Sequence, residues 1–158
     1  KGNVDQMPSN AIKDPNNLLM QQADGTFREM GQTAGLASTE RGRGAALADF
    51  DGDGRLDVLV LNRRAPLEIY RNETPNAGHW LAVSLLQPGG NRHAIGASVT
   101  INGDMQRTII GGGHAGGQAG PLHFGLGAAT QAEITVEWPG GQITHHKTAA
   151  NQAITLSP

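Results

Sequence analysis

The sequence predicts an all-β protein, and three observations support this. Short runs rich in Val, Ile, Thr and Leu recur along the chain, and these residue types favour strands. Gly, Asn, Asp and Pro fill the gaps, so turns separate the runs at a spacing of roughly ten residues. No stretch keeps a helical period of apolar residues over about 11 positions. Such a pattern is typical of a β-sandwich, a barrel or part of a propeller.

The expected strands follow one another in two groups, each strand being a short alternating or apolar run between turn residues. The first group lies at residues 26–30, 45–50, 56–62 and 67–71. A polar break at residues 73–78 follows, and the second group lies at residues 80–86, 97–101, 106–110, 122–124, 132–138, 142–146 and 153–156. We expect domains at residues 1–74 and 75–158, and only residues 16–22 resemble a short helix.

Composition excludes several classes of function. The chain has 158 residues, a formal net charge of −2 and 37% hydrophobic residues, which argues against a disordered chain. It has no bulk positive charge to recruit nucleic acid or anionic lipid. No apolar run is long enough to span a membrane. Because the sequence contains no cysteine, disulfides and thiolate metal sites are excluded.

The strongest chemical signal is the acidic segment DFDGDGRLD at residues 49–57. Carboxylates recur at its first, third, fifth and ninth positions, and Gly54 at the sixth permits a sharp turn. Ca²⁺ is bound by six to eight oxygen atoms, so this spacing predicts a calcium loop. The expected ligands are the Asp49, Asp51, Asp53 and Asp57 side chains and the Arg55 backbone carbonyl.

An EF-hand, a magnesium site and a solvated acidic turn fit this segment less well. An EF-hand needs a bidentate Glu at its twelfth position, but Val60 stands there, inside an apolar run. Mg²⁺ rarely occupies an all-protein cage. A solvated acidic turn is the simplest alternative. However, two unit charges 4–5 Å apart repel by about 3–4 kcal/mol at an effective dielectric constant near 20, so a bound cation is favoured.

The first half of the chain resembles one FG-GAP (VCBS-type) repeat. The resemblance rests on DGTF at 24–27, AGL at 34–36, and residues 44–62 around the acidic segment, and it covers about residues 16–72. It implies a β-propeller blade carrying a calcium loop. Since one blade cannot close a ring, we expect the chain to be the C-terminal piece of a larger propeller protein.

The second half resembles the ASPIC/UnbV domain. The carrying motifs are HWL at 79–81, NRHAIGA at 91–97, HFGLG at 123–127 and VEWPGG at 136–141. The resemblance implies a small β-sandwich or barrel that follows FG-GAP repeats in secreted proteins. Its family has no settled biochemical activity, so it indicates a fold more strongly than a function.

Three weaker signals remain. Residues 111–116 formally match GxGxxG, but no helix can begin after them, so a turned loop is favoured over a phosphate site. Trp80 and Trp138 are expected to cap a core, the alternative being a platform for sugar stacking. Residues 72–74 fit the N-glycosylation pattern.

The sequence therefore predicts a non-enzymatic, calcium-binding module for adhesion or recognition, extracellular or periplasmic in a secreted parent protein. The expected partner is an extracellular protein or glycan, not nucleic acid, and an unpaired sheet edge favours a dimer. Two alternatives stay open: an accessory domain of an enzyme whose catalytic part lies elsewhere, and a structural cap on the propeller.

Overall fold

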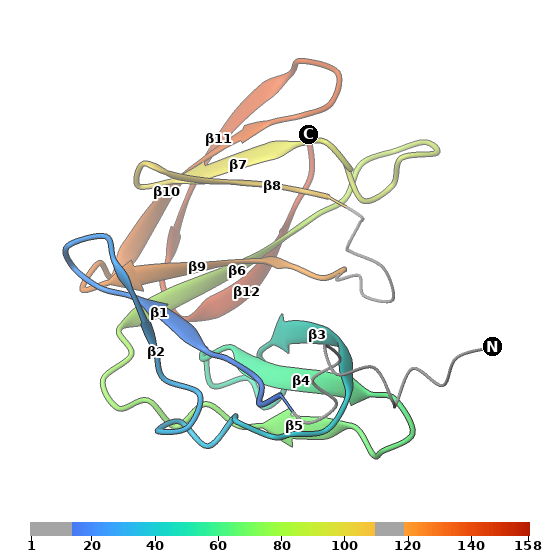
Figure 1. Cartoon of the computed structure of the whole chain (residues 1–158). Helices are drawn as coiled ribbons and strands as arrows, with labels where there is room; N and C mark the ends of the chain where they lie inside the picture. The colour runs from blue at the N-terminus through green and yellow to red at the C-terminus, as the bar shows by residue number, and fades with distance from the viewer. Residues whose placement is uncertain (1–13, 110–118) are drawn as a thin grey trace.

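The chain is built from β-strands. The computed structural model describes residues 14–109 and 119–158, and within these ranges every helix or strand assigned is a strand (Figure 1). The predicted all-β class is confirmed. The glycine-rich segment at 111–116 lies outside the described residues. In the part described, no helix is long and apolar enough to cross a membrane.

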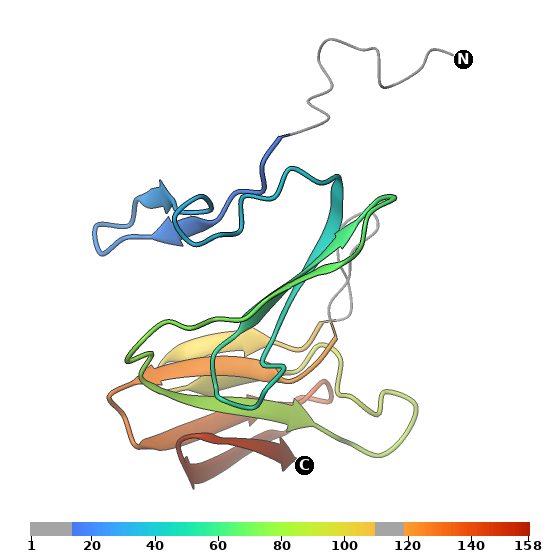
Figure 2. The same cartoon turned by 90° about the horizontal axis from the view of Figure 1, so that it is seen from below.

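The N-terminal part contains a hairpin and a small sheet. Strands β1 (Leu19–Gln21) and β2 (Phe27–Glu29) pair antiparallel. Strands β3 (Gly42–Ala48), β4 (Asp57–Asn62) and β5 (Glu68–Tyr70) form an antiparallel sheet with β4 in the centre. The hairpin projects from this sheet and stands apart from the rest of the molecule (Figure 2), and all its strand residues are exposed.

Residues 16–22 form part of this hairpin, so the helical alternative is wrong. The turn chemistry after β1 explains the difference. Asp24 accepts hydrogen bonds from the hydroxyl and the amide of Thr26 at 2.7 and 2.9 Å, and these bonds lower the pKa of Asp24. Gly25 takes a positive φ of 83°. An Asp-Gly turn of this kind reverses the chain, and β2 then supplies the backbone partners of β1.

The C-terminal part begins with a three-stranded sheet. Strand β6 (His79–Leu85) lies between β9 (Leu122–Gly127) and β12 (Gln152–Leu156). The β6–β9 pair is antiparallel, whereas β12 runs parallel to β6. The last strand of the chain therefore pairs with the first strand of this part and closes it.

A four-stranded sheet faces the first. Its order is β11 (Ile143–Ala149), β10 (Gln131–Glu137), β7 (Ser98–Ile101) and β8 (Asp104–Arg107). Strand β8 begins two residues before the expected segment 106–110. The reason is a two-residue Asn-Gly turn after β7, in which both residues take a positive φ, because this turn type starts the second strand at once.

One hydrophobic core fills the space between the two sheets, so the second part is a sandwich rather than a barrel. Trp138 is buried in this core and donates its indole N–H to the Thr144 hydroxyl at 3.0 Å, so it caps the core as expected. The buried members of the core all come from this second part: Leu81, Val83, Leu85, Ala94, Ala97, Val99, Ile101, Phe124, Ala132, Ile134, Val136 and Trp138.

The N-terminal part is far more exposed. It contains eight of the eleven large apolar side chains that are exposed among the described residues: Leu19, Met20, Phe27, Leu47, Phe50, Leu61, Leu67 and Ile69. Within it, Val60 at the centre of β4 is a buried apolar residue. The sandwich thus has its own core, whereas the N-terminal sheet of β3, β4 and β5 has little apolar packing of its own.

We expect Ile134→Ala to lower the free energy of unfolding of the sandwich by about 2–5 kcal/mol, because it leaves a cavity in the core. Ile134 is 1% exposed. The matched control is Ile143→Ala in the neighbouring strand, where the side chain is 58% exposed, and it should cost less than about 1 kcal/mol. Urea unfolding measures both, and equal losses would contradict the assignment of the core.

Candidate metal centre

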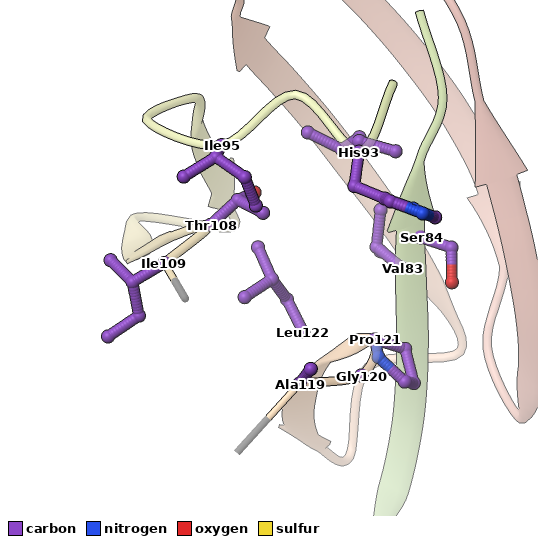
Figure 3. Close-up of a pocket in the computed structure, with 11 residues that line it drawn as sticks. Val83, Ser84, His93, Ile95, Thr108, Ile109, Ala119, Gly120, Pro121 and Leu122 are labelled. Carbon is purple, nitrogen blue, oxygen red and sulfur yellow. The ribbon is translucent and has the colours of Figure 1, made fainter. Parts of the chain in front are cut away.

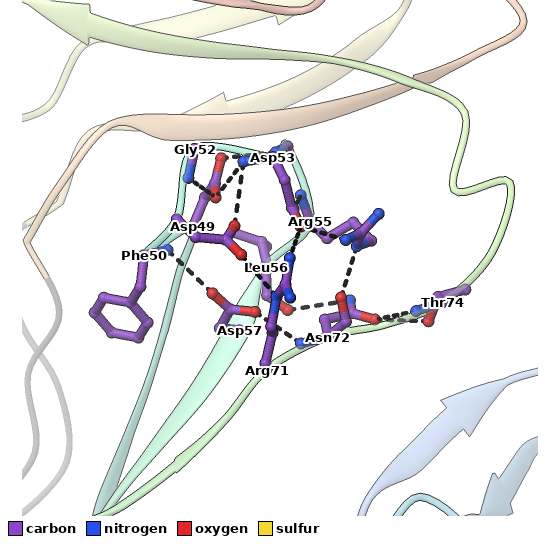
Figure 4. Close-up of polar contacts among 12 residues, drawn as sticks. Asp49, Phe50, Gly52, Asp53, Arg55, Leu56, Asp57, Arg71, Asn72 and Thr74 are labelled. Carbon is purple, nitrogen blue, oxygen red and sulfur yellow. Dashed lines mark hydrogen bonds and ion pairs between the residues drawn. The ribbon is translucent and has the colours of Figure 1, made fainter.

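The acidic loop lies between β3 and β4, and Asp57 closes it. Asp57 is the first residue of β4 and is only 2% exposed. One of its carboxylate oxygens accepts the Phe50 amide at 3.1 Å, and the other accepts the Asn72 amide at 2.7 Å (Figure 4). The side chain therefore ties the start of the loop to the segment that leaves β5.

Asp49 organises the interior of the loop. Its Oδ1 accepts the backbone amides of Gly52 and Asp53 at 2.8 and 3.1 Å, and its Oδ2 accepts the amide of Gly54 at 2.9 Å. The chain can wind around one carboxylate in this way because Gly52 and Gly54 take positive φ values of 77° and 87°, which glycine adopts at little cost.

Three of the expected ligands converge. One carboxylate oxygen from each of Asp49, Asp51 and Asp57 lies within 4.8 Å of the others. An ionised carboxylate offers about four lone-pair positions, so the backbone hydrogen bonds of Asp49 and Asp57 leave some free. The group supplies only oxygen ligands from one short loop, which suits a hard divalent cation.

Asp53, the fourth expected carboxylate, is not part of this group. Its side chain forms ion pairs with the guanidiniums of Arg55 and Arg71. The hydrogen bond from the Arg55 backbone amide, followed by the charge of Arg55 and a hydrogen bond from Arg71, lowers the pKa of Asp53. Arg55, expected to contribute only its carbonyl, also donates its Nε to the Asn72 carbonyl at 2.6 Å.

Arg71 is the functional side chain that sequence reasoning missed. Its Nε lies 2.7 Å from Oδ2 of Asp51, and its Nη2 lies 3.4 Å from Oδ2 of Asp53. The charge of Asp51 raises the pKa of Arg71. The pairing of Val58 with Tyr70 explains this position, because it brings the residue after Tyr70 alongside the loop. Four carboxylates and two guanidiniums leave the loop with an excess of two negative charges.

Asn72 holds the loop from the other side. Its amide nitrogen donates to the Leu56 carbonyl at 3.1 Å, and its amide oxygen accepts the amide and hydroxyl of Thr74 at 3.0 and 2.6 Å. A glycan would be attached to that same amide nitrogen. The structure therefore favours a structural role for residues 72–74 over glycosylation.

A separate cavity of about 360 Å³ opens beside β6 in the sandwich (Figure 3). Its described lining is mostly apolar and includes Val83, Thr108 and Leu122. His93 is the one ionisable side chain among those lining residues. The described walls thus contain no pair of acid and base groups.

Comparison with known families agrees with these two parts. The model described as FG-GAP-like repeat matches residues 9–60, which include the whole acidic loop, and the model described as ASPIC and UnbV matches residues 87–158. The resemblance seen in the sequence is confirmed: the earlier stretch of the chain is similar to an FG-GAP-like repeat, and the later stretch is similar to the ASPIC and UnbV family.

The chain is also similar to curated proteins called cartilage acidic protein 1. It is 29% identical to the Mus musculus protein over 143 residues, which is 85% of this chain and 22% of that protein. It is 31% identical to the Xenopus tropicalis protein over 131 residues, 78% of this chain and 20% of that protein. The chain thus spans about a fifth of the length of these relatives.

We expect Arg71→Gln to tighten divalent cation binding by roughly tenfold, because it removes a positive charge that competes for Asp51 and Asp53. The matched control is Arg64→Gln. Arg64 lies beyond the far end of β4 from Asp57 and also takes a positive φ, of 62°, so this variant changes the net charge equally without touching the loop. Calorimetric titration with CaCl₂ measures both. Weaker binding by the Arg71 variant would show that the arginine supports the cation instead of competing with it.

Proposed function

We propose that this chain is a Ca²⁺-binding module without catalytic activity of its own, acting in extracellular adhesion or recognition. The observation that carries the proposal is the convergence of Asp49, Asp51 and Asp57 within 4.8 Å, one of them buried. Carboxylates this close repel one another strongly. A divalent cation would remove that repulsion and balance the loop's excess of two negative charges.

Calcium is favoured over magnesium by the character of the ligands. The proposed set is the carboxylates of Asp49, Asp51, Asp53 and Asp57 with the Arg55 carbonyl, all from one chain segment. Ca²⁺ tolerates such an irregular cage of protein oxygens, whereas Mg²⁺ demands octahedral geometry and keeps several waters. For Asp53 to join the set, its oxygens must be shared with, or released from, the two arginines.

The similar proteins support an extracellular location. Their printed name refers to cartilage, an extracellular tissue, and nothing supports the periplasmic alternative. We propose the division into residues 1–74 and 75–158, with the calcium loop in the first unit. The proposed partner is an extracellular protein or glycan, and neither nucleic acid nor a membrane span is part of the proposal.

Two other functions stay less favoured. An accessory domain of an enzyme would act beside a catalytic part elsewhere in the parent protein, and no feature of the described residues favours that role over cation binding. A structural cap on a propeller agrees with the apolar surface of the N-terminal part. It does not explain a loop that gathers four acidic residues.

We expect Ca²⁺ to stabilise the chain. At a free concentration of 100 times Kd, linkage predicts about 2.7 kcal/mol of added stability, or an increase in Tm of roughly 5–10 °C for a chain of this size. Thermal melts in CaCl₂, MgCl₂ and EDTA, together with calorimetric titration, measure this. The same Tm in CaCl₂ and EDTA, with no heat of binding, would disprove the proposal.

The matched variants are Asp51→Ala in the loop and Asp104→Ala at the exposed start of β8, which remove the same charge. Asp51→Ala should weaken Ca²⁺ binding by more than about tenfold, since it removes a charged ligand. Asp104→Ala should bind as the wild type does. Both should keep the sandwich folded, because its core contains no residue of the loop.

We also expect the chain to form a dimer through β5, one edge of the three-stranded sheet, because an edge strand offers unpaired backbone groups to a second copy. Ile69→Lys on β5 should abolish dimer formation, and Ile143→Lys on β11 should not. Sedimentation velocity at increasing protein concentration measures this. A wild-type chain that is monomeric throughout would contradict the expectation.

A further inference from the structure

Trp80 and His123 lie next to each other on the outer face of the sandwich. Side chains alternate along β6, so Leu81 and Val83 point into the core while Trp80 and Ala82 point outward. The register pairs Ala82 with His123, which makes His123 the diagonal neighbour of Trp80 on the same face. Their rings stack with centroids 5.7 Å apart and planes 6° apart. We call these two residues the seat.

The acidic loop contacts the seat through Gly54. A Cβ atom added at Gly54 would overlap the Nε1 and Cδ1 atoms of the Trp80 ring, so the backbone is in direct contact with the indole. The Nε2 of His123 lies 3.0 Å from the Gly54 carbonyl oxygen. A carbonyl only accepts, so His123 donates this hydrogen bond.

Burial around the contact shows that the seat is covered. Gly54 is buried. Ala82 lies opposite His123 on the same outer face and is 7% exposed, although it does not belong to the sandwich core. Strands of the sandwich pass directly beside the loop (Figure 4). The backbone of the loop therefore packs against the indole ring of Trp80. This contact argues against a sugar-stacking platform at this residue.

The contact acts on the part of the loop that sets its shape. Gly54 follows Asp53, precedes Arg55, and donates its amide to Asp49. Holding this residue fixes the turn that brings Asp49 and Asp51 toward Asp57. A loop that is ordered before binding loses less conformational entropy when a ligand arrives, so it binds more tightly.

We propose that Trp80 and His123 are positioning residues of the metal centre: the sandwich holds the loop in its cation-binding shape. By thermodynamic reciprocity, a bound cation in turn strengthens the contact between the two parts of the chain. This inference rests on the proposed calcium function and adds that cation affinity depends on residues outside the repeat.

The first test compares Gly54→Ala with Gly52→Ala in the full chain. Both glycines take a positive φ, so alanine is strained at either position. A Cβ at Gly52 has nothing within 4 Å, whereas a Cβ at Gly54 meets Trp80. Calorimetric titration with CaCl₂ should show that Gly54→Ala binds at least about tenfold more weakly than Gly52→Ala.

Histidine variants keep the test decisive if Gly54→Ala does not fold. His123→Ala should weaken Ca²⁺ binding by about fivefold, because one hydrogen bond to the loop is lost. His123→Gln keeps an N–H donor and should restore most of the affinity. His145→Ala is the control. The His145 side chain is hydrogen-bonded to Thr135 on the neighbouring strand β10, so its removal should not affect Ca²⁺ binding.

Tryptophan emission gives an independent measurement. The chain has two tryptophans, one in the seat and one in the sandwich core. Titration with CaCl₂ should change the emission of the wild type but not of Trp80→Phe, which leaves only the core tryptophan. If Gly54→Ala and His123→Ala both bind Ca²⁺ with the affinity of the wild type, the positioning role of Trp80 and His123 is wrong, while the calcium proposal stands. A wild type that binds no calcium would overturn both.

Discussion

The loop depends on how the carboxylate of Asp57 is held, since this is the one charged side chain buried among the described residues. Each of its oxygens accepts a backbone amide, from Phe50 or from Asn72. These two bonds fix the loop at the start of β4 and hold the segment after β5 against it. A buried anion needs compensation, and here the nearest side-chain groups include two further carboxylates. A divalent cation would compensate all three together, which explains why a fold would keep such a cluster.

The two parts of the chain are stabilised in different ways. The sandwich buries a continuous core and closes itself by pairing its last strand, β12, with its first, β6. The N-terminal sheet of β3, β4 and β5 has little buried apolar surface, and the side chains of Leu47, Leu61 and Ile69 on it are exposed. Besides its own strand pairing, this sheet is held by hydrogen bonds around the loop and by the contact of Gly54 with Trp80 and His123. The proposed cation site therefore lies where the repeat contacts the sandwich.

The sequence predicts those features that depend on residues close together in the chain. All eleven expected strands overlap strands of the structure, because alternation and turn residues are short-range signals. The spacing of the acidic residues likewise predicts the cluster, because one loop supplies it. Strand β1 has only exposed residues and no alternation, so it gives no such signal. The parallel pairing of β12 with β6 joins distant segments and cannot be predicted from either. Arg71 reaches the loop only through the register of β4 with β5, and Gly54 meets the seat only after both parts have folded.

One divalent cation should bind where the three carboxylates converge, against the sandwich. A crystal structure of the full chain grown with a calcium-like lanthanide, located by its anomalous scattering, tests this most directly. We predict one strong peak about 2.3–2.6 Å from carboxylate oxygens of Asp49, Asp51 and Asp57, with Gly54 still on Trp80. A structure with no peak in the loop, and with Arg71 still paired to Asp51, would contradict it.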